Sequence, residues 1–332
     1  MRHFYRLSEF SVEEINRFLD VAFQFKQSPY RSRCLDQKQI GLLFLNPSLR
    51  TRCSFEVAVR QLAGGVSTLE AQSLWKLETE MGVRMDGDRS EHVKEAVGVL
   101  SRYFDGIGLR AFARGVDEKE DLLDRTISVF MEHSKVPVFN MESAAYHPCQ
   151  ALADLMTIRE LLGAFKGRRI TISWAPHPLA LPMAVPNSIL LASCQMGMDV
   201  TLAHPPGFDI HSAILSMAQD LSRKAQGSLR VVNDQRQGVA DTEVVYAKAW
   251  SGLLRYTDPA AEEALRRKYS DWMVNASLMG LTRRAYFMHC LPVRRNVVVS
   301  DEVLDSAQSV VFREAENRLH VQKAILEWIY SG

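Results

Sequence analysis

The chain has 332 residues, a length at which a single hydrophobic core stops growing, so two domains are expected. Hydrophobic residues make up 47% and charged residues 24%, which is typical of a globular enzyme. Forty Lys and Arg against 39 Asp and Glu leave a formal net charge of +1, which excludes a global electrostatic field for nucleic acid or an anionic membrane. Any phosphate must therefore be bound by a local site.

The cysteines indicate reduced thiols. They are odd in number, widely spaced and free of any C-x-x-C pair, which argues against a disulfide scaffold and a zinc site; they are Cys34, Cys53, Cys149, Cys194 and Cys290. The N-terminal segment has no apolar signal core, and nowhere are there eighteen consecutive apolar residues. We therefore expect a cytoplasmic location, with neither a membrane nor a nucleic acid as partner. The basic residues Arg31 and Arg33 are interpreted as a solvated turn.

Short apolar runs alternate with segments of helical period along the chain, which predicts βα units on largely parallel sheets. In the first half we expect strands at 40–46, 66–70, 106–111 and 137–141 and helices at 51–63, 90–103 and 119–133. In the second half we expect strands at 169–174, 199–203, 229–232, 244–247 and 285–289, with helices at 184–196 and 211–225. The predicted fold is α/β, with two doubly wound parallel-sheet domains linked by helices.

The domain boundary is predicted from the segment 148–163, which has the period of a helix and no internal Pro or Gly before its end. It lies between the two series of strands. We therefore expect domains at 1–147 and 148–312. The long amphipathic segment 313–332 is expected to pack back on the first domain and complete it.

The segment 44–52 predicts an anion site, because a strand-like run ends in hydroxyl and guanidinium groups where a helix begins. Backbone N–H groups at a helix start are unpaired and carry the positive end of the helix dipole. Ser48 and Thr51 add hydroxyl donors and Arg50 adds a fork-shaped cation. Ordinary helix capping by Ser or Thr is the alternative interpretation of the same residues.

Other polar residues follow the predicted strands where a doubly wound sheet opens its crevice. They are Arg110 after the third strand, Glu142 and His147 after the fourth, and then Gln150. Each alone is typical of a structural residue, but together they favour a site that binds an anion and a carbonyl group. Two loops accompany them: 70–87, which is unusually long, and 174–186, which holds four prolines in thirteen residues.

These motifs resemble the aspartate/ornithine carbamoyltransferase superfamily over essentially the whole chain. The matching blocks are Ser48 to Arg52, His147 to Asp154, and His289 to Pro292, with Leu49 where the phosphate motif usually has Thr. The blocks at 75–78, 85–88, 174–178 and 293–296 are similar to the branch that carbamoylates N-acylated ornithine. The resemblance implies a homotrimer with active sites at subunit interfaces, no metal or organic cofactor, and a trefoil knot in which the proline-rich loop encircles the chain near 244–250.

The resemblance also implies roles for individual residues. The catalytic positions, which polarise the carbamoyl oxygen, are Thr51, Arg110 and His147. Gln150 orients the carbamoyl amide, and Trp75 closes the pocket from the neighbouring subunit; its alternative is a partly buried loop anchor. Carbamoyl phosphate is expected to contact Ser48, Leu49, Arg50, Thr51, Trp75, Arg110, His147, Gln150, Cys290, Leu291 and Arg318. The backbone of Cys290 is expected to matter more than its thiol.

For the second substrate, Glu142, Lys248 and Arg294 match positions that hold the amino-acid portion. No side-chain base stands out, so the departing phosphate is the expected acceptor of the amine proton. A Glu at position 90 goes with acetylornithine in this branch, whereas Ser90 leaves room and a donor for a succinyl group. Val298, where acetyl-specific relatives carry Lys, agrees.

We therefore expect a carbamoyltransferase acting on N-succinylornithine in arginine biosynthesis. N-acetylornithine is the alternative, and free ornithine is a more distant one. Leu179 departs from the basic residue that relatives place in the proline-rich loop, so His177 and Arg295 are the candidates for the succinyl carboxylate. A nicotinamide-dependent dehydrogenase is disfavoured, because no Gly-x-Gly-x-x-Gly follows any predicted strand.

Overall fold

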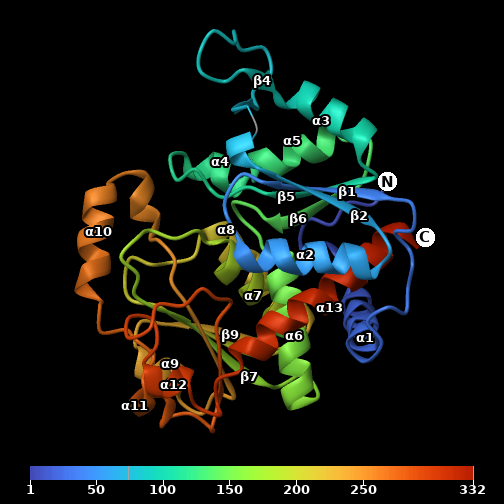
Figure 1. Cartoon of the computed structure of the whole chain (residues 1–332). Coiled ribbons are helices and arrows are strands. Elements are labelled where there is room, and N and C mark those ends of the chain that lie inside the picture. The colour runs from blue at the N-terminus through green and yellow to red at the C-terminus, as the bar shows by residue number, and fades with distance from the viewer. Residues whose placement is uncertain (74, 332) are drawn as a thin grey trace.

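The computed structural model describes residues 1–73 and 75–331, and its main feature is a pair of parallel sheets (Figure 1). The first sheet has the order β2-β1-β5-β6 and the second the order β11-β10-β7-β8-β9. The first consists of β1 (Gln39–Phe44), β2 (Gly65–Glu70), β5 (Gly106–Arg110) and β6 (Val138–Glu142). The second consists of β7 (Arg169–Trp174), β8 (Asp199–Ala203), β9 (Ser228–Val232), β10 (Val244–Lys248) and β11 (Tyr286–Met288). The predicted α/β class with two domains is confirmed.

Helices cover the first sheet on both sides. Figure 1 shows α3 (Val93–Tyr103), α4 (Glu118–Leu122) and α5 (Arg125–His133) on one side and α2 (Leu49–Gln61) on the other. The strands lie between two apolar layers: Leu42 belongs to one buried cluster and Leu43 to another. Alternate residues of a strand point to opposite faces, so the strand is buried on both.

The strand β10 of the second sheet is also buried on both faces. Val244 and Tyr246 of β10 belong to one apolar cluster, and Val245 and Ala247 to another. The helices α7 (Ala184–Gln195), α8 (Ser212–Lys224) and α9 (Gln235–Val239) pack against strands of this sheet.

Three helices join the two halves. The helix α6 (Pro148–Leu162) begins at the predicted linker and is buried over most of its length. It packs against α13 (Val311–Tyr330) and α1 (Val12–Gln27), and α13 also contacts α2. The C-terminal segment therefore returns to the first half of the chain, as Figure 1 shows.

Short elements complete the chain. They are η1 (Leu7–Glu9), η2 (Ala71–Ser73), β3 (Leu77–Glu78), β4 (Glu91–His92), η3 (Leu253–Tyr256), α10 (Pro259–Lys268), α11 (Ala276–Met279) and α12 (Asp301–Leu304). The expected helix at 119–133 is divided into α4 and α5 at Asp124, whose φ of 53° is incompatible with a continuous helix.

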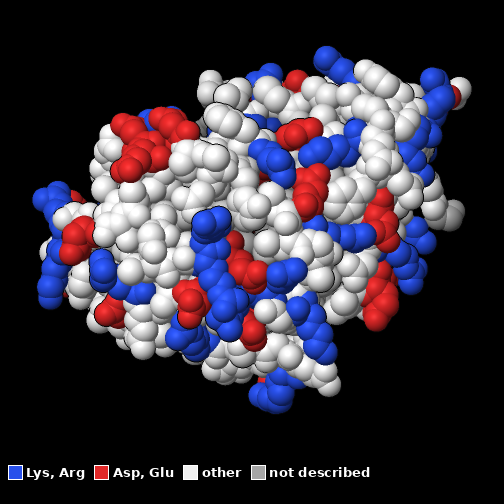
Figure 2. Space-filling view, turned by 90° about the horizontal axis from the view of Figure 1, so that it is seen from below, with Lys and Arg blue, Asp and Glu red and all other residues white. Residues whose placement is uncertain are grey.

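The surface shows no extended field of one sign in the view of Figure 2, where basic and acidic side chains are interspersed. Within residues 1–73 and 75–331, no helix combines the length and apolar character needed to cross a bilayer.

Candidate active site

The predicted site residues lie at the carboxyl ends of parallel strands from both sheets. In the first sheet β1 leads to Ser48, β5 ends at Arg110 and β6 ends at Glu142. In the second sheet β10 ends at Lys248, and β11 is followed by the segment 289–291. Doubly wound sheets bind their ligands at this edge.

The N-terminus of α2 is capped by Ser48, whose Oγ accepts a hydrogen bond of 3.2 Å from the Thr51 amide. The side chain of Leu49 is 72% exposed, so the presence of Leu in place of Thr does not disturb the backbone at the start of α2. Arg50 is half-buried, and this burial lowers the pKa of its guanidinium. The helix start therefore combines unpaired amides with a partly desolvated cation.

Arg318 joins three distant segments below that helix start. It is buried on α13, and its Nη atoms donate to Thr51 Oγ1 at 2.9 Å and Gln150 Oε1 at 2.7 Å. The Gln150 Nε2 donates in turn to Asp154 Oδ1 at 2.7 Å and Glu314 Oε1 at 3.0 Å. Both amide hydrogens of Gln150 are therefore used within the protein.

Asp154 and Glu314 were not singled out by sequence reasoning. Burial raises the pKa of Asp154 to about 7, and burial together with the Asp154 charge raises the pKa of Glu314. Asp154 lies within a matching block and carried a signal, whereas Glu314 is one of several carboxylates on an amphipathic helix.

Arg110, Glu142 and His147 form a second cluster. Arg110 is ion-paired with Glu142, and His147 Nε2 lies 3.5 Å from the same carboxylate oxygen. Burial and the charges of Arg318, Arg110 and Lys248 hold the pKa of His147 well below its ordinary value, so its imidazole is neutral at pH 7.

Buried side-chain nitrogens without partners occur on residues of both clusters. Arg110 Nε, His147 Nδ1 and Arg318 Nε are buried and have no hydrogen-bond partner among the described residues. Buried polar groups are normally paired, and an unpaired one costs about 1–3 kcal/mol. Three of them on site residues are suited to an oxygen-rich ligand.

The loop that carries Glu142 and His147 is held by Asp124. Its carboxylate accepts hydrogen bonds from the Ser143 hydroxyl and from the Ala144 amide at 3.0 Å. Burial raises the pKa of Asp124 to about 6. Sequence reasoning missed Asp124, because its role depends on a bend between two helices that the helical period does not reveal.

The second half contributes the segment 289–291. The His289 amide donates to Glu314 Oε2, and the Leu291 amide donates to His289 Nδ1, each at 2.9 Å. Burial raises the pKa of the Cys290 thiol, so this cysteine is protonated at neutral pH and is poorly suited to act as a nucleophile.

The proline-rich loop meets the segment after β11 through His177, whose Nε2 accepts from Arg294 Nε at 2.9 Å. Arg295, the other candidate for the succinyl carboxylate, is ion-paired with Asp301 at 2.7 Å and Asp305 at 2.6 Å. Val298 is 2% exposed and belongs to the apolar core, so its side chain does not line the site surface.

Two predicted residues stand apart from the site in the single chain. Trp75 is 70% exposed and borders a cavity with Leu45 and Asn46, just before the start of α2. Ser90 is exposed immediately before β4, in the region that Figure 1 shows projecting from the molecule.

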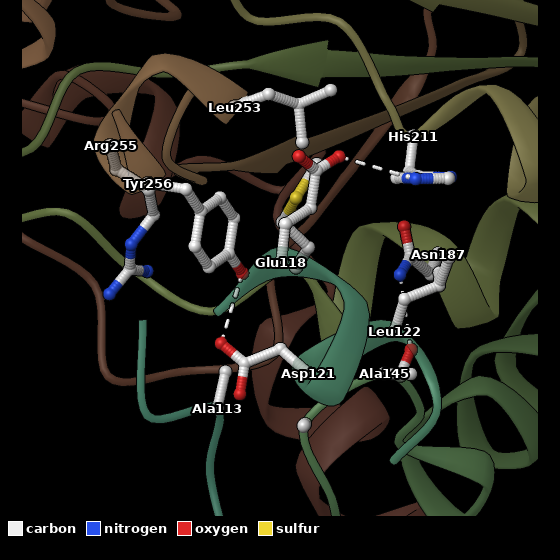
Figure 3. Close-up of a pocket in the computed structure, with 12 residues that line it drawn as sticks. Ala113, Glu118, Asp121, Leu122, Ala145, Asn187, His211, Leu253, Arg255 and Tyr256 are labelled. Carbon is white, nitrogen blue, oxygen red and sulfur yellow. Dashed lines mark hydrogen bonds and ion pairs between the residues drawn. The ribbon is translucent and has the colours of Figure 1, made fainter. Parts of the chain in front are cut away.

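A small cavity lies between the two halves of the chain, next to the candidate site, and is lined by residues of both (Figure 3). Two contacts cross it: Tyr256 donates to Asp121 at 3.0 Å, and His211 Nε2 lies 3.2 Å from Glu118 Oε1. Asn187 also donates to the Ala145 carbonyl at 3.1 Å, next to the loop that carries His147. These contacts tie the relative position of the halves to the site.

No cluster of three or more His, Cys, Asp or Glu able to hold a metal occurs within the described part of the chain.

Two family descriptions match the sequence. The carbamoyl-P binding domain of aspartate/ornithine carbamoyltransferase matches residues 2–160, and the Asp/Orn binding domain of the same family matches residues 183–329.

Individual relatives match along their full length. The N-acetylornithine carbamoyltransferase of Xanthomonas campestris is 40% identical over 98% of this chain and 97% of the relative. The N-succinylornithine carbamoyltransferase of Bacteroides thetaiotaomicron is 37% identical over 97% of this chain and 96% of the relative. A crystal structure of acetylornithine transcarbamylase complexed with acetylcitrulline is 39% identical, with a TM-score of 0.97 over 99% of each chain.

Proposed function

Because the chain belongs to the aspartate/ornithine carbamoyltransferase family and is an enzyme, we propose that it carbamoylates the δ-amine of N-succinyl-L-ornithine. The products are N-succinyl-L-citrulline and phosphate, and the reaction belongs to arginine biosynthesis. The observation that carries the proposal is the convergence of the α2 N-terminus with the unpaired buried donors of Arg110, His147 and Arg318.

Carbamoyl phosphate binds first in this proposal. Its phosphate contacts the Ser48 hydroxyl, the backbone at Leu49 and the side chains of Arg50 and Thr51. The amides and the helix dipole favour a dianion there before any side chain acts. This placement leaves the carbamoyl group facing Arg110 and His147, each of which has a buried nitrogen without a partner among the described residues.

The carbamoyl oxygen gains negative charge as the amine attacks. Thr51, Arg110 and neutral His147 donate to it, and donors aimed at developing charge lower the barrier. Both amide hydrogens of Gln150 are engaged, and its Oε1 accepts from Arg318, so the second lone pair of Oε1 accepts from the carbamoyl N–H. The Cys290 and Leu291 carbonyls accept the one remaining carbamoyl hydrogen, and Arg318 holds Gln150 and Thr51 in place.

The amine then forms a C–N bond to the carbamoyl carbon while the bond from that carbon to the phosphate oxygen breaks. The departing phosphate takes the amine proton, so no side-chain base is required. Glu142, Lys248 and Arg294 hold the amino-acid portion of the acylornithine. Glu142 already neighbours Arg110, which places the two substrates side by side.

The succinyl group is favoured by Ser90, because a carboxylate at this position would repel the succinyl carboxylate. Solved structures of a relative with one glutamate replaced by alanine, proline or serine are complexed with N-succinyl-L-norvaline. His177 and Arg295 stay the candidates for the succinyl carboxylate. Arg295 is ion-paired with two aspartates, and both ring nitrogens of His177 also have partners within the chain. N-acetylornithine remains the alternative, supported by relatives of that name at 40% identity.

A homotrimer completes the proposed site, because Trp75 and Ser90 are exposed rather than joined to the site of their own chain. They would reach the site of the neighbouring subunit. We also propose a trefoil knot through the 174–186 loop, a boundary between the halves at residue 147, and a cytoplasmic location, which the free cysteines support.

The test is a product assay with carbamoyl phosphate and N-succinylornithine, N-acetylornithine or ornithine as amine. We expect kcat/KM to be highest for N-succinylornithine and lowest for ornithine. A higher kcat/KM for N-acetylornithine would show that the alternative substrate is the correct one. Activity on ornithine alone would refute the proposal that the enzyme acts on an N-acylornithine.

A further inference from the structure

Arg266 is a buried arginine on α10 that sequence reasoning did not single out. It is 6% exposed and is ion-paired one turn away with Glu262, which is 1% exposed. Its Nη2 donates to Glu262 Oε2 at 2.9 Å. Burial of such a pair is weak evidence for a role in stability, because apolar residues of similar volume often serve as well.

The rest of the Arg266 guanidinium contacts the proline-rich loop. Its Nη1 donates to the carbonyl oxygens of His177 at 3.1 Å and Pro178 at 2.5 Å. Glu262 Oε1 accepts from the Gly252 amide at 3.2 Å, beside the point where the Ser251 amide donates to Leu181. A planar fork can satisfy a carboxylate and two carbonyls together, which a lysine cannot.

The loop in turn sets the orientation of His177. Its Nδ1 lies 3.0 Å from both the amide and the carbonyl of Leu179, while its Nε2 receives Arg294 at 2.9 Å. The ring is therefore fixed by backbone on one side and presents its other nitrogen to Arg294. Arg266 holds that backbone in place.

We propose that Arg266, supported by Glu262, is a positioning residue for the acylornithine substrate, acting through His177 and Arg294. The inference rests on the proposed function. The hydrogen bonds of Arg266 reach only the part of the site built by the second half of the chain. The proposed phosphate site, at the start of α2 and at Arg318, shares none of these partners. The effect of Arg266 should therefore separate the two substrates.

The test replaces both members of the pair, Glu262→Leu with Arg266→Met, so that no buried charge is left alone. The matched control is Glu263→Leu with Arg267→Met, an ion pair of the same spacing on the same helix whose side chains are 47% and 79% exposed. Arg266→Lys is a second variant, which keeps the charge but loses the fork. Steady-state kinetics of each substrate and hydrogen exchange of the 175–183 peptide are measured on all proteins.

We expect the 262/266 variant to raise the KM for the acylornithine about tenfold or more and to speed exchange in 175–183. The KM for carbamoyl phosphate should change less than twofold, Arg266→Lys should be intermediate, and the control should match the unaltered enzyme. Unchanged exchange, unchanged acylornithine KM, or an equal rise in both KM values would each overturn the proposal. An unaltered enzyme that carbamoylates no acylornithine would instead refute the proposed function.

Discussion

His147 lies where three cationic groups surround a buried imidazole. Burial disfavours its protonation most, and the charges of Arg318, Arg110 and Lys248 disfavour it further. A neutral ring offers one N–H donor and loses no proton while it polarises a carbonyl. The surrounding cations therefore fix the chemical form in which this residue acts.

Replacement of His147 by Asn should lower kcat about 100-fold or more, because the shorter side chain moves its donor away from the developing oxyanion. The measurement is the rate of acylcitrulline formation at saturating substrates. His133→Asn is the control, since His133 ends α5 near the opposite edge of the sheet. A rate close to that of the unaltered enzyme would exclude His147 from the chemistry.

Ser90→Glu should shift the amine preference. The added carboxylate repels a succinyl carboxylate and leaves an acetyl group unaffected, so kcat/KM for N-succinylornithine should fall about tenfold relative to N-acetylornithine. Ser90→Ala should leave the ratio within about threefold. Equal losses for both amines would show that position 90 does not read the acyl group.

Sequence reasoning named the residues whose chemistry lies in a short motif, and their roles in the site stay predictions. Thr51, Arg110, Glu142, His147 and Gln150 follow strand ends, and the parallel sheet gathers them. It missed the carboxylates that hold them, namely Asp124, Asp154 and Glu314, because only the tertiary structure shows what they contact. Val298 was read as a specificity cue and is buried in the core.

At the scale of elements, the start of α2 has both a structural and a binding role. Ser48→Ala removes the acceptor for the Thr51 amide and should cost about 1 kcal/mol of stability. It should also weaken carbamoyl phosphate binding. Ser11→Ala is the matched control, because Ser11 caps α1 in the same way. Calorimetric titration should show weaker binding for Ser48→Ala alone; equal affinity in both variants would reduce Ser48 to a cap.

The helix α13 buries Lys323, whose Nζ donates to Gln61 at 2.7 Å and has no carboxylate partner within residues 1–73 and 75–331. Burial lowers the pKa of Lys323 to about 8 from an ordinary 10.5. Between these values the unfolded chain binds more protons, so stability should rise with pH there. Urea unfolding should show the unaltered protein gaining stability relative to Lys323→Met between pH 8 and 10. A constant difference would contradict the shift.

Helices and strands were predictable from the sequence where the apolar residues followed a single helical or strand pattern. All nine predicted strands are observed. The central ones are buried, and their sequences are nearly continuous apolar runs between turns, whereas the edge strands β2 and β9 are only partly buried. The break at Asp124 and the helix α1 were not predicted. Asp124 bends the chain and binds the 143–145 loop, which no periodicity reveals. The helix α1 has a clear apolar face at Ile15, Phe18, Leu19, Ala22 and Phe25, and the sequence analysis did not use it.

At the scale of the molecule, the two halves are joined by α1, α6 and α13 and by the contacts around Tyr256 and His211 (Figure 3). Site residues come from both sides of this junction. In the proposed trimer, the exposed Trp75 and Ser90 would contribute to the site of a neighbouring subunit.

Subunit mixing tests that sharing. Trimers of Trp75→Ala and of His147→Asn should each be nearly inactive, but random hybrids should recover activity at roughly a quarter of the sites. Each recovered site takes its His147 from one parent and its Trp75 from the other. Absence of recovery in confirmed hybrid trimers would place Trp75 in its own chain's site.

The most direct measurement is a crystal structure of the protein with carbamoyl phosphate. The account predicts the phosphate at residues 48–51 and the carbamoyl oxygen within hydrogen-bond distance of Thr51, Arg110 and His147. Density for the compound at another place, with the start of α2 empty, would contradict it.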